Sequence, residues 1–414
     1  MTTSGRRPAL ALGAIFAAFA IERLAYYMFR SVFMMHLVTA QHMTPAEAKG
    51  VYTVAAFAIV LGLVGGGGAT WALGPRVTMV AGLGLAALGH LLGLGAPQLA
   101  IFVLGLAAGV VRVAPYAAIA EELELGPDRP SRGVALAATV YAAANVGAML
   151  ASSIAGALGS SQGARPVFVV AAVLAALAAG VAALAFLAPR RVPEPAPPML
   201  QPNLEAGYRG APAVVGGGVP IAWTGIIVSA VALSSGVSIA AVAEEAVHHA
   251  VISDRSQSFR ATEALYTVNP VMVIGAAAFV AAVYGYGARS RPSRALGVGL
   301  VIVGVGSALA PFLPWPAALL PTVALAAAEP LVSGAAFGVA ATRVPPRLAG
   351  PFAAGVGALL QMASLFANRL GNALEGSAPV IVVLALLALG AGVAVLAAAR
   401  PLLEEDPPTG AGGA

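Results

Sequence analysis

A band of polar side chains interrupts the first long apolar stretch of the chain, residues 21–37. The band consists of Glu22, Arg23, Tyr26, Tyr27 and Arg30. On an α-helix each residue advances by about 100°, so these five residues fall within an arc of roughly 140°. An ionisable group at membrane depth costs several kcal/mol unless it is paired or faces water. The stretch therefore predicts either a site that binds substrate or protons, or a structural ion-pair network between packed helices.

Charged groups also interrupt two later apolar stretches. Arg112 offers a planar guanidinium that suits a carboxylate, which is either Glu22 or a substrate group. Glu329 and Ser333 are four residues apart, so a helix places them on one face. Glu329 is either a functional acid or a protonated group that hydrogen-bonds to a neighbouring helix. Both residues are candidates for a site at membrane depth.

Two asparagines complete the set of polar candidates. Asn145 could bind a substrate carbonyl, or it could hydrogen-bond to the backbone of a packed helix. Asn269 precedes Pro270, which frees backbone carbonyl groups, so Asn269 could also line a bend in its helix. For both asparagines the binding role and the structural role remain open at this point.

The composition places these residues in a membrane protein. The 414 residues are 59% hydrophobic and 9% charged, with a mean hydropathy of +0.90. A soluble domain carries about 25% charged residues. A membrane span needs about 20 apolar residues, and the apolar blocks suffice for about twelve helices. The absence of cysteine excludes disulfides and thiolate chemistry. The net charge of +5 records membrane orientation, so we do not expect nucleic-acid binding.

The apolar blocks predict an all-α integral membrane fold. The expected helices cover residues 9–37, 50–72, 77–94, 99–121, 133–158, 166–188, 220–249, 262–287, 294–313, 315–341, 349–373 and 378–399. Residues 1–188 form one expected six-helix half and residues 220–400 the other, joined by a proline- and glycine-rich linker at 189–219. Residues 401–414 form an expected disordered tail.

The loops predict an orientation. Arginines gather in the loops on the side of the N-terminus, which places both termini in the cytoplasm and the protein in the cell (inner) membrane. Gly133 follows Arg132 at the start of one expected helix, and Gly350 follows Arg347 at the start of another. Runs of small residues come after both, and such residues let membrane helices approach closely. Two halves with a site between them near the midplane is a transporter architecture.

A possible metal motif occurs at residues 244–249. Glu244 with His248, and Glu245 with His249, have the i, i+4 spacing that can hold a divalent metal. The motif falls at the outer end of an expected helix, where solvated polar residues are common. We therefore favour a solvated helix end and predict neither a metal site nor a bound cofactor, apart from protons as a coupling ion.

The polar motifs together resemble those of the proton-dependent oligopeptide transporter family of the major facilitator superfamily. In the first helix, Glu22, Arg23, both tyrosines and Arg30 match Glu-Arg-Phe-x-Tyr-Tyr-Gly and the basic residue that follows it. Arg112 stands where the family has a lysine, and Tyr141 and Asn145 match Phe-Tyr-x-x-Ile-Asn. Asn269-Pro270 matches Ser-Leu-Asn-Pro-Leu. Glu329 and Ser333 match Gly-Glu-x-x-x-Ser. The resemblance implies twelve helices in a 6+6 arrangement.

The chain departs from this family at three acidic or polar positions. Phe19 replaces the first acid of the helix-1 motif, and Thr70 replaces an aspartate in the loop after the second helix. Ser234 and Ser235 stand where the family has a Glu-Gln pair. Two carboxylates associated with proton coupling are therefore missing, which leaves Glu22, with Arg23, and Glu329 as the expected coupling residues.

The resemblance implies a transporter that moves short peptides or peptide-like molecules by alternating access and proton coupling. Substrate-binding residues would be Arg30, Tyr26, Tyr27, Arg112, Asn145, Asn269, Glu329 and Ser333. The alternatives are export of a peptide-like natural product or drug, and uncoupled facilitated transport. An enzyme is disfavoured because the buried acids are scattered, and a sensor because no output domain is present. We expect a monomer in the lipid bilayer.

Overall fold

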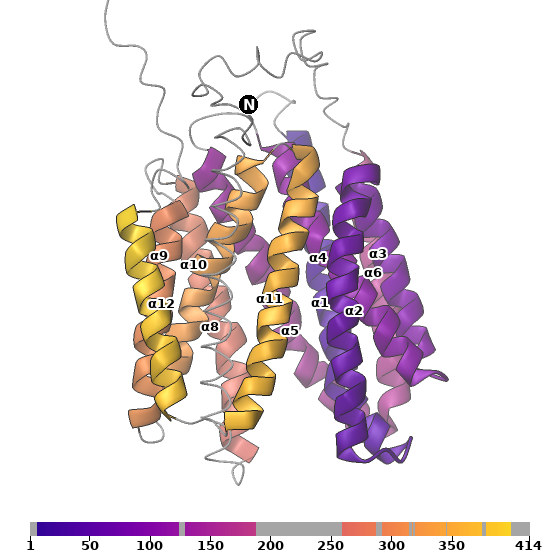
Figure 1. The fold of residues 1–414 in the computed structure, drawn as a ribbon. Coiled ribbons are helices and arrows are strands. Elements are labelled where there is room, and N and C mark those ends of the chain that lie inside the picture. The colour runs from indigo at the N-terminus through magenta and orange to yellow at the C-terminus, as the bar shows by residue number, and fades with distance from the viewer. Residues whose placement is uncertain are drawn as a thin grey trace, which may run out of the picture.

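The chain folds into a bundle of long, roughly parallel and antiparallel helices in the computed structural model (Figure 1). The structure describes residues 6–123, 129–187, 259–286, 292–313, 317, 319–344, 346–374 and 378–398. The N-terminal bundle consists of α1 (Arg6–Thr39), α2 (Pro45–Leu73), α3 (Pro75–Leu92), α4 (Pro97–Glu122), α5 (Arg129–Gln162) and α6 (Ala164–Ala183), which ends in the short helix η2 (Leu184–Leu187).

The C-terminal bundle contains the remaining described helices. These are α8 (Phe259–Tyr286), α9 (Pro292–Leu309) with the short helix η4 (Ala310–Phe312), α10 (Leu319–Arg343), α11 (Pro346–Leu374) and α12 (Ala378–Ala398). Each lies within a few residues of an expected helix. The expected helix at 220–249, the linker at 189–219 and the tail at 401–414 lie outside the described residues.

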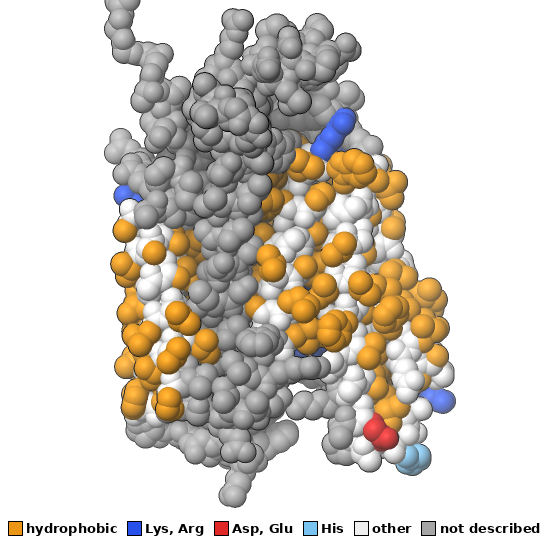
Figure 2. Space-filling model, in the orientation of Figure 1, with side chains coloured by type: hydrophobic (Ala, Val, Ile, Leu, Met, Phe, Trp, Pro, Cys, Tyr) orange, Lys and Arg blue, Asp and Glu red, His pale blue; other side chains and the backbone are white. Residues whose placement is uncertain are grey.

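Most of the described helices have the length and composition of membrane spans. Within the described residues, eight helices are long and apolar enough to cross a bilayer, and shorter apolar stretches occur at 269–285 and 381–397. Hydrophobic side chains cover most of the described surface that faces the viewer in Figure 2, and most of the visible charged side chains lie near its two ends. A bilayer would cover this apolar surface.

Proline and glycine mark where the first helices begin and end. Pro45, Pro75 and Pro97 each occupy the first turn of a helix, where a missing N–H leaves no hydrogen bond unmade. Thr44 caps α2, and its side chain and Glu47 form a reciprocal capping box. Gly74 separates α2 from α3 with a φ of 82°, a backbone conformation that disfavours other residues.

Small residues hold the helices of each bundle close together. In the N-terminal bundle α4 packs on α2, and a Cβ at Gly66 would lie only 2.8 Å from the Cα of Val110. In the C-terminal bundle α9 packs on α12, and a Cβ at Gly304 would lie 2.8 Å from the backbone nitrogen of Leu389. Backbones approach this closely in membranes only where small residues face each other.

The two bundles meet mainly through α2 and α5 of the N-terminal bundle and α8, α10 and α11 of the C-terminal bundle. α5 packs against α8 and α10, and α2 packs against α11. α1 begins at the end of the molecule where α2 and α10 end and where α5 and α11 begin (Figure 1). We call this end the N-terminal face. Of the predicted site residues, Asn145, Asn269, Glu329 and Ser333 lie on these helices, and the others lie on α1 and α4.

An ion pair fixes α3, α4 and η2 at the N-terminal face. The Arg76 guanidinium donates to the Glu122 carboxylate at 3.0 Å and to the backbone oxygen of Ala185 at 2.8 Å. Arg76 is 3% exposed, so both contacts are shielded from solvent. This link lies within the N-terminal bundle and makes its end a rigid unit.

Candidate functional site

Glu22 and Arg23 form a buried ion pair within α1. The Arg23 Nε donates to Glu22 Oε2 at 2.5 Å, and Nη2 donates to Oε1 at 2.7 Å. The two residues are 1% and 2% exposed. The guanidinium also lies 5.4 Å from the centre of the Phe19 ring and 4.8 Å from that of Tyr26, within the range of cation–π attraction. The pair is thus electrically neutral and is completed by residues of its own helix.

The structure does not contain the pairing of Arg112 with Glu22 that the sequence left open. Both oxygens of the Glu22 carboxylate bind Arg23. Arg112 is half-buried in the middle of α4 and has no hydrogen-bond or ion-pair partner among the described residues. Its positive charge is therefore not compensated by any described acid.

Glu329 has a partner on the opposite bundle. The Tyr141 hydroxyl of α5 donates a short hydrogen bond to the Glu329 carboxylate of α10. Both side chains are half-buried. A hydrogen bond to an ionised group is about twice as strong as a neutral one. The acid of the C-terminal bundle is thereby tied to the N-terminal bundle.

Three other predicted polar residues, Asn145, Ser333 and Asn269, lie on α5, α10 and α8. The Asn145 amide donates to the backbone oxygen of Tyr141 at 3.0 Å, one turn earlier in the same helix. Ser333 is buried at 7% exposure, one turn after Glu329. Asn269 is half-buried on α8 beside Pro270. Asn145 uses one amide proton on its own helix and not on the packed helix that its structural interpretation named.

The rest of the helix-1 band divides into buried and accessible residues. Tyr26 is 9% exposed and contacts the half-buried Tyr27 edge to face, with ring centres 5.6 Å apart. Arg30 is exposed. The structure thus brings together Glu22, Arg23 and Tyr26 in one cluster and Tyr141, Asn145 and Glu329 in another.

The bundles are closed against each other near the N-terminal face by an aromatic pair. Tyr116 of α4 and Phe337 of α10 stack with ring centres 4.1 Å apart and ring planes 9° apart. Their exposed fractions are 3% and 4%. Neither residue was singled out from the sequence, because a stacking partner on a distant helix leaves no local pattern.

Small residues close the same end of the interface on two sides. Between α5 and α10, a Cβ at Gly338 would lie 2.7 Å from the backbone nitrogen of Val134, and a Cβ at Gly133 would overlap Thr342. Between α2 and α11, a Cβ at Gly350 would overlap the Thr70 hydroxyl. Thr70, where the resembled motif carries aspartate, donates this hydroxyl to the backbone oxygen of Gly67 at 2.8 Å. No water path fits between backbones this close.

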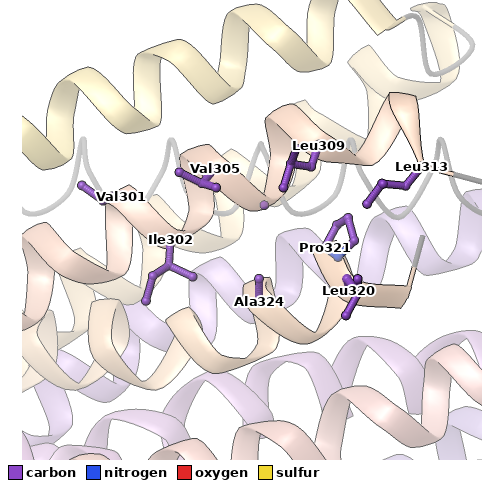
Figure 3. Close-up of a pocket in the computed structure, with 9 residues that line it drawn as sticks. Val301, Ile302, Val305, Leu309, Leu313, Leu320, Pro321 and Ala324 are labelled. Carbon is purple, nitrogen blue, oxygen red and sulfur yellow. The ribbon is translucent and has the colours of Figure 1, made fainter. Parts of the chain in front are cut away.

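A separate apolar pocket lies between α9 and α10, with a volume of about 450 Å³ (Figure 3). Its described lining contains only apolar residues, among them Val301, Ile302, Leu309, Leu320 and Ala324. The pocket lies where α9 ends in η4 and α10 begins. With no polar group to orient a polar solute, it is not a candidate for the site predicted from the sequence.

Metal binding has no support within the described residues, where no group of three or more His, Asp or Glu side chains converges. The pairs at 244–249 lie outside the described residues. Tyr141 is the main polar residue to which sequence analysis gave no role. Its position one turn before Asn145, within the matched motif, was the available signal.

Solved structures of three transporters share this fold. An auto-inhibited POT family peptide transporter has a TM-score of 0.60 and 16% identity, over 93% of this chain and 96% of that chain. The human organic anion transporter MFSD10 (TETRAN) has a TM-score of 0.65 and 15% identity, over 94% of this chain and 99% of that chain. The proton:xylose symporter XylE has a TM-score of 0.65 and 13% identity, over 96% of each chain. At these identities the likeness establishes the fold alone. The sequence matches none of the curated proteins.

The sequence also matches a family description. The Major Facilitator Superfamily model covers residues 15–368, which is most of the chain and includes all the predicted site residues. The match agrees with the apolar helices, the two bundles and the polar groups between them. The chain belongs to the Major Facilitator Superfamily and is a multi-pass membrane transporter, not an enzyme.

Proposed function

We propose that this transporter carries short peptides or peptide-like zwitterions by alternating access, as a divergent relative of the proton-dependent oligopeptide transporters. The observation that carries the proposal is the charge of Arg112 at the middle of α4, which no described acid pairs, in a protein whose other bundle carries the membrane acid Glu329. The motif resemblance supports the family, and the POT peptide transporter among the structural neighbours is compatible with it.

The two charges suit the two ends of a zwitterion. A half-buried guanidinium at membrane depth costs several kcal/mol without an anion, and a substrate carboxylate would supply one. Its planar fork matches a carboxylate in two hydrogen bonds. Arg30, exposed on α1, would assist at the same end. The substrate ammonium would bind Glu329 and displace the Tyr141 hydroxyl. Hydrogen bonds to the substrate would come from Tyr26, Tyr27, Asn145, Asn269 and Ser333.

Proton coupling is assigned mainly to Glu329. Protonation of Glu22 would leave Arg23 buried without its partner, which is costly. Protonation of Glu329 would convert a charged hydrogen bond to Tyr141 into a weaker neutral one and loosen a contact between the bundles. Glu22 and Arg23 remain part of the proposed coupling network as the fixed charge pair of α1.

Alternating access requires the N-terminal face to open. The Tyr116–Phe337 pair and the glycine contacts close that face in this structure. Because loop arginines gather on the same side, we propose that the face is cytoplasmic and that the described state is closed to the cytoplasm. The substrate would leave or enter there after α10 and α11 separate from α5 and α2.

An organic anion is the second candidate substrate. Since Arg23 neutralises Glu22, Arg112 on α4 leaves a positive charge in the N-terminal bundle that no described acid pairs. A substrate with a carboxylate but no ammonium would then depend on Arg112 and be indifferent to Glu329. Export of a peptide-like natural product or drug would use the same site, since ion gradients set the direction.

The test is uptake of a labelled dipeptide into proteoliposomes, with and without an inward proton gradient. We expect gradient-stimulated uptake that is lost in Arg112→Gln. In Glu329→Gln we expect weaker uptake that no longer responds to the gradient. Uptake that ignores the gradient in the wild type would indicate an uncoupled facilitator. No dipeptide uptake in either condition would contradict the proposal. Uptake of a labelled monocarboxylate that requires Arg112 but not Glu329 would favour the organic anion.

A further inference from the structure

Gln361 is a polar side chain near the middle of α11 (Pro346–Leu374) that sequence analysis did not single out. Its side chain is half-buried, and it has no hydrogen-bond partner among the described residues. A glutamine amide offers two donors and an acceptor. In a membrane span such groups are stable only beside water, a ligand or another polar group. The position therefore calls for water or a ligand beside it.

The register of α11 directs Gln361 toward the N-terminal bundle. Positions 350, 354, 357 and 361 share one face of a helix with 3.6 residues per turn. The first three contact α2. Gly350 meets Thr70, a Cβ at Gly67 would lie 2.8 Å from the Cβ of Ala354, and a Cβ at Gly357 would lie 3.0 Å from Leu63 Cδ2. Gln361 is the next residue on this face, away from the closed N-terminal face.

The opposite face of α11 has a different environment. Leu359 lies about 180° around the helix from this face, and it is 49% exposed. An apolar, exposed side chain on a membrane-spanning helix faces lipid. One side of α11 therefore faces lipid. The other side faces the interface, where small residues pack up to position 357 and the polar Gln361 follows. In spans of this kind a polar group at mid-depth faces an internal path.

We propose that Gln361 lines the aqueous substrate path between the bundles and hydrogen-bonds the uncharged polar part of the substrate, an amide or hydroxyl group. The proposal rests on the proposed function, in which Arg112 and Glu329 bind the charged ends. A glutamine amide pairs with the C=O and N–H of a peptide bond, so Gln361 selects for a substrate that has such a group between its charges.

The chain contains no cysteine, so a single introduced thiol reports on its own position. In reconstituted protein, Gln361→Cys should react with a charged, water-soluble maleimide at least about tenfold faster than Leu359→Cys, the matched position on the lipid side. Saturating dialanine should slow the labelling of Gln361→Cys. Equal labelling rates at the two positions, or no protection by a transported dialanine, would overturn the proposal.

Transport kinetics provide a second readout. A lost hydrogen bond worth about 1.4 kcal/mol is a tenfold change in affinity. Gln361→Leu should raise the KM for dialanine about tenfold with little change in kcat, and Gln361→Asn should recover part of the loss. A fall in kcat with unchanged KM would indicate a structural role and overturn substrate contact. If the wild type does not transport dialanine, the peptide proposal fails, and the labelling comparison alone decides whether Gln361 lines the path.

Discussion

Glu22 and Glu329 are both acids inside membrane-spanning helices, but their partners lie in different places. Glu22 binds the next residue of its own helix, and both side chains are buried. Glu329 on α10 binds Tyr141 on α5, across the interface between the bundles. A movement of one bundle against the other leaves the first pair intact and breaks the second. The comparison separates contacts that stabilise the fold from contacts that set the conformational state.

The largest effect is expected at the pair within α1. Glu22→Gln leaves the Arg23 guanidinium buried without a counter-charge, which costs about 3–5 kcal/mol of the free energy of unfolding. Thermal unfolding in detergent should show a large fall in Tm. Glu47→Gln, at an exposed acid, is the comparison. Because glutamine can also complete the capping box of α2, Tm should fall much less. A Glu22→Gln protein as stable as the wild type would contradict the claim that the Glu22–Arg23 pair stabilises the fold.

Removing the hydroxyl of Tyr141 should change the equilibrium between the closed and open conformations and leave the stability of the fold unchanged. A hydrogen bond to a charged group contributes about 1.5–3 kcal/mol, so Tyr141→Phe should shift the equilibrium toward an open N-terminal face by roughly tenfold or more. Spin labels on α5 and α10 would report the change in distance. A large fall in Tm with unchanged distances would show that this contact stabilises the fold instead.

The glycine contact between α5 and α10 tests the comparison without any charge. Gly338→Ala adds a methyl group 2.7 Å from the backbone of Val134, and overpacking of this kind costs about 1–3 kcal/mol. Gly355→Ala on α11 meets open space and is the matched control. We expect slower dipeptide uptake and a more open N-terminal face only in Gly338→Ala. Equal behaviour of the two variants would contradict a closed interface at Gly338.

The smallest effect is expected at the aromatic pair. Phe337→Leu removes a stacked ring but keeps an apolar side chain, so it should cost about 0.5–1.5 kcal/mol of the closed state. A few-fold increase in the accessibility of a thiol placed at the N-terminal face would report it. No change in accessibility would show that the glycine contacts alone close this end.

The sequence analysis predicted the helices well because apolar length and proline positions are local signals. The expected helix at 378–399 and α12 (Ala378–Ala398) differ by one residue at the end. The runs of small residues after Gly133 and Gly350 were expected to permit close packing. The structure shows such packing at Gly147 against Ala20 and at Ala354 against Gly67. The ion-pair partners could not be predicted in the same way. Which acid binds which base depends on side-chain conformations, so the pairing of Glu22 with Arg23 was not predicted.

Phe19 illustrates the same limit. Compared with the family motif it counts as a lost acid, but in the fold its ring lies beside the Arg23 guanidinium. Contacts across the bundle interface, such as Tyr116 with Phe337, join residues that are distant in the sequence and carry no shared pattern. Local chemistry was therefore predictable, and the long-range partners that define the closed state were not.

The most direct test of the account is to lock the interface with a disulfide and measure transport. A Cβ at Gly334 of α10 would lie 3.6 Å from the Cβ of Ala138 of α5, within the range of disulfide geometry. Because the native chain has no cysteine, Ala138→Cys with Gly334→Cys supplies the only thiols. The account predicts that oxidation abolishes dipeptide uptake and that reduction restores it. Full uptake by the cross-linked protein would contradict the claim that these bundles separate during transport.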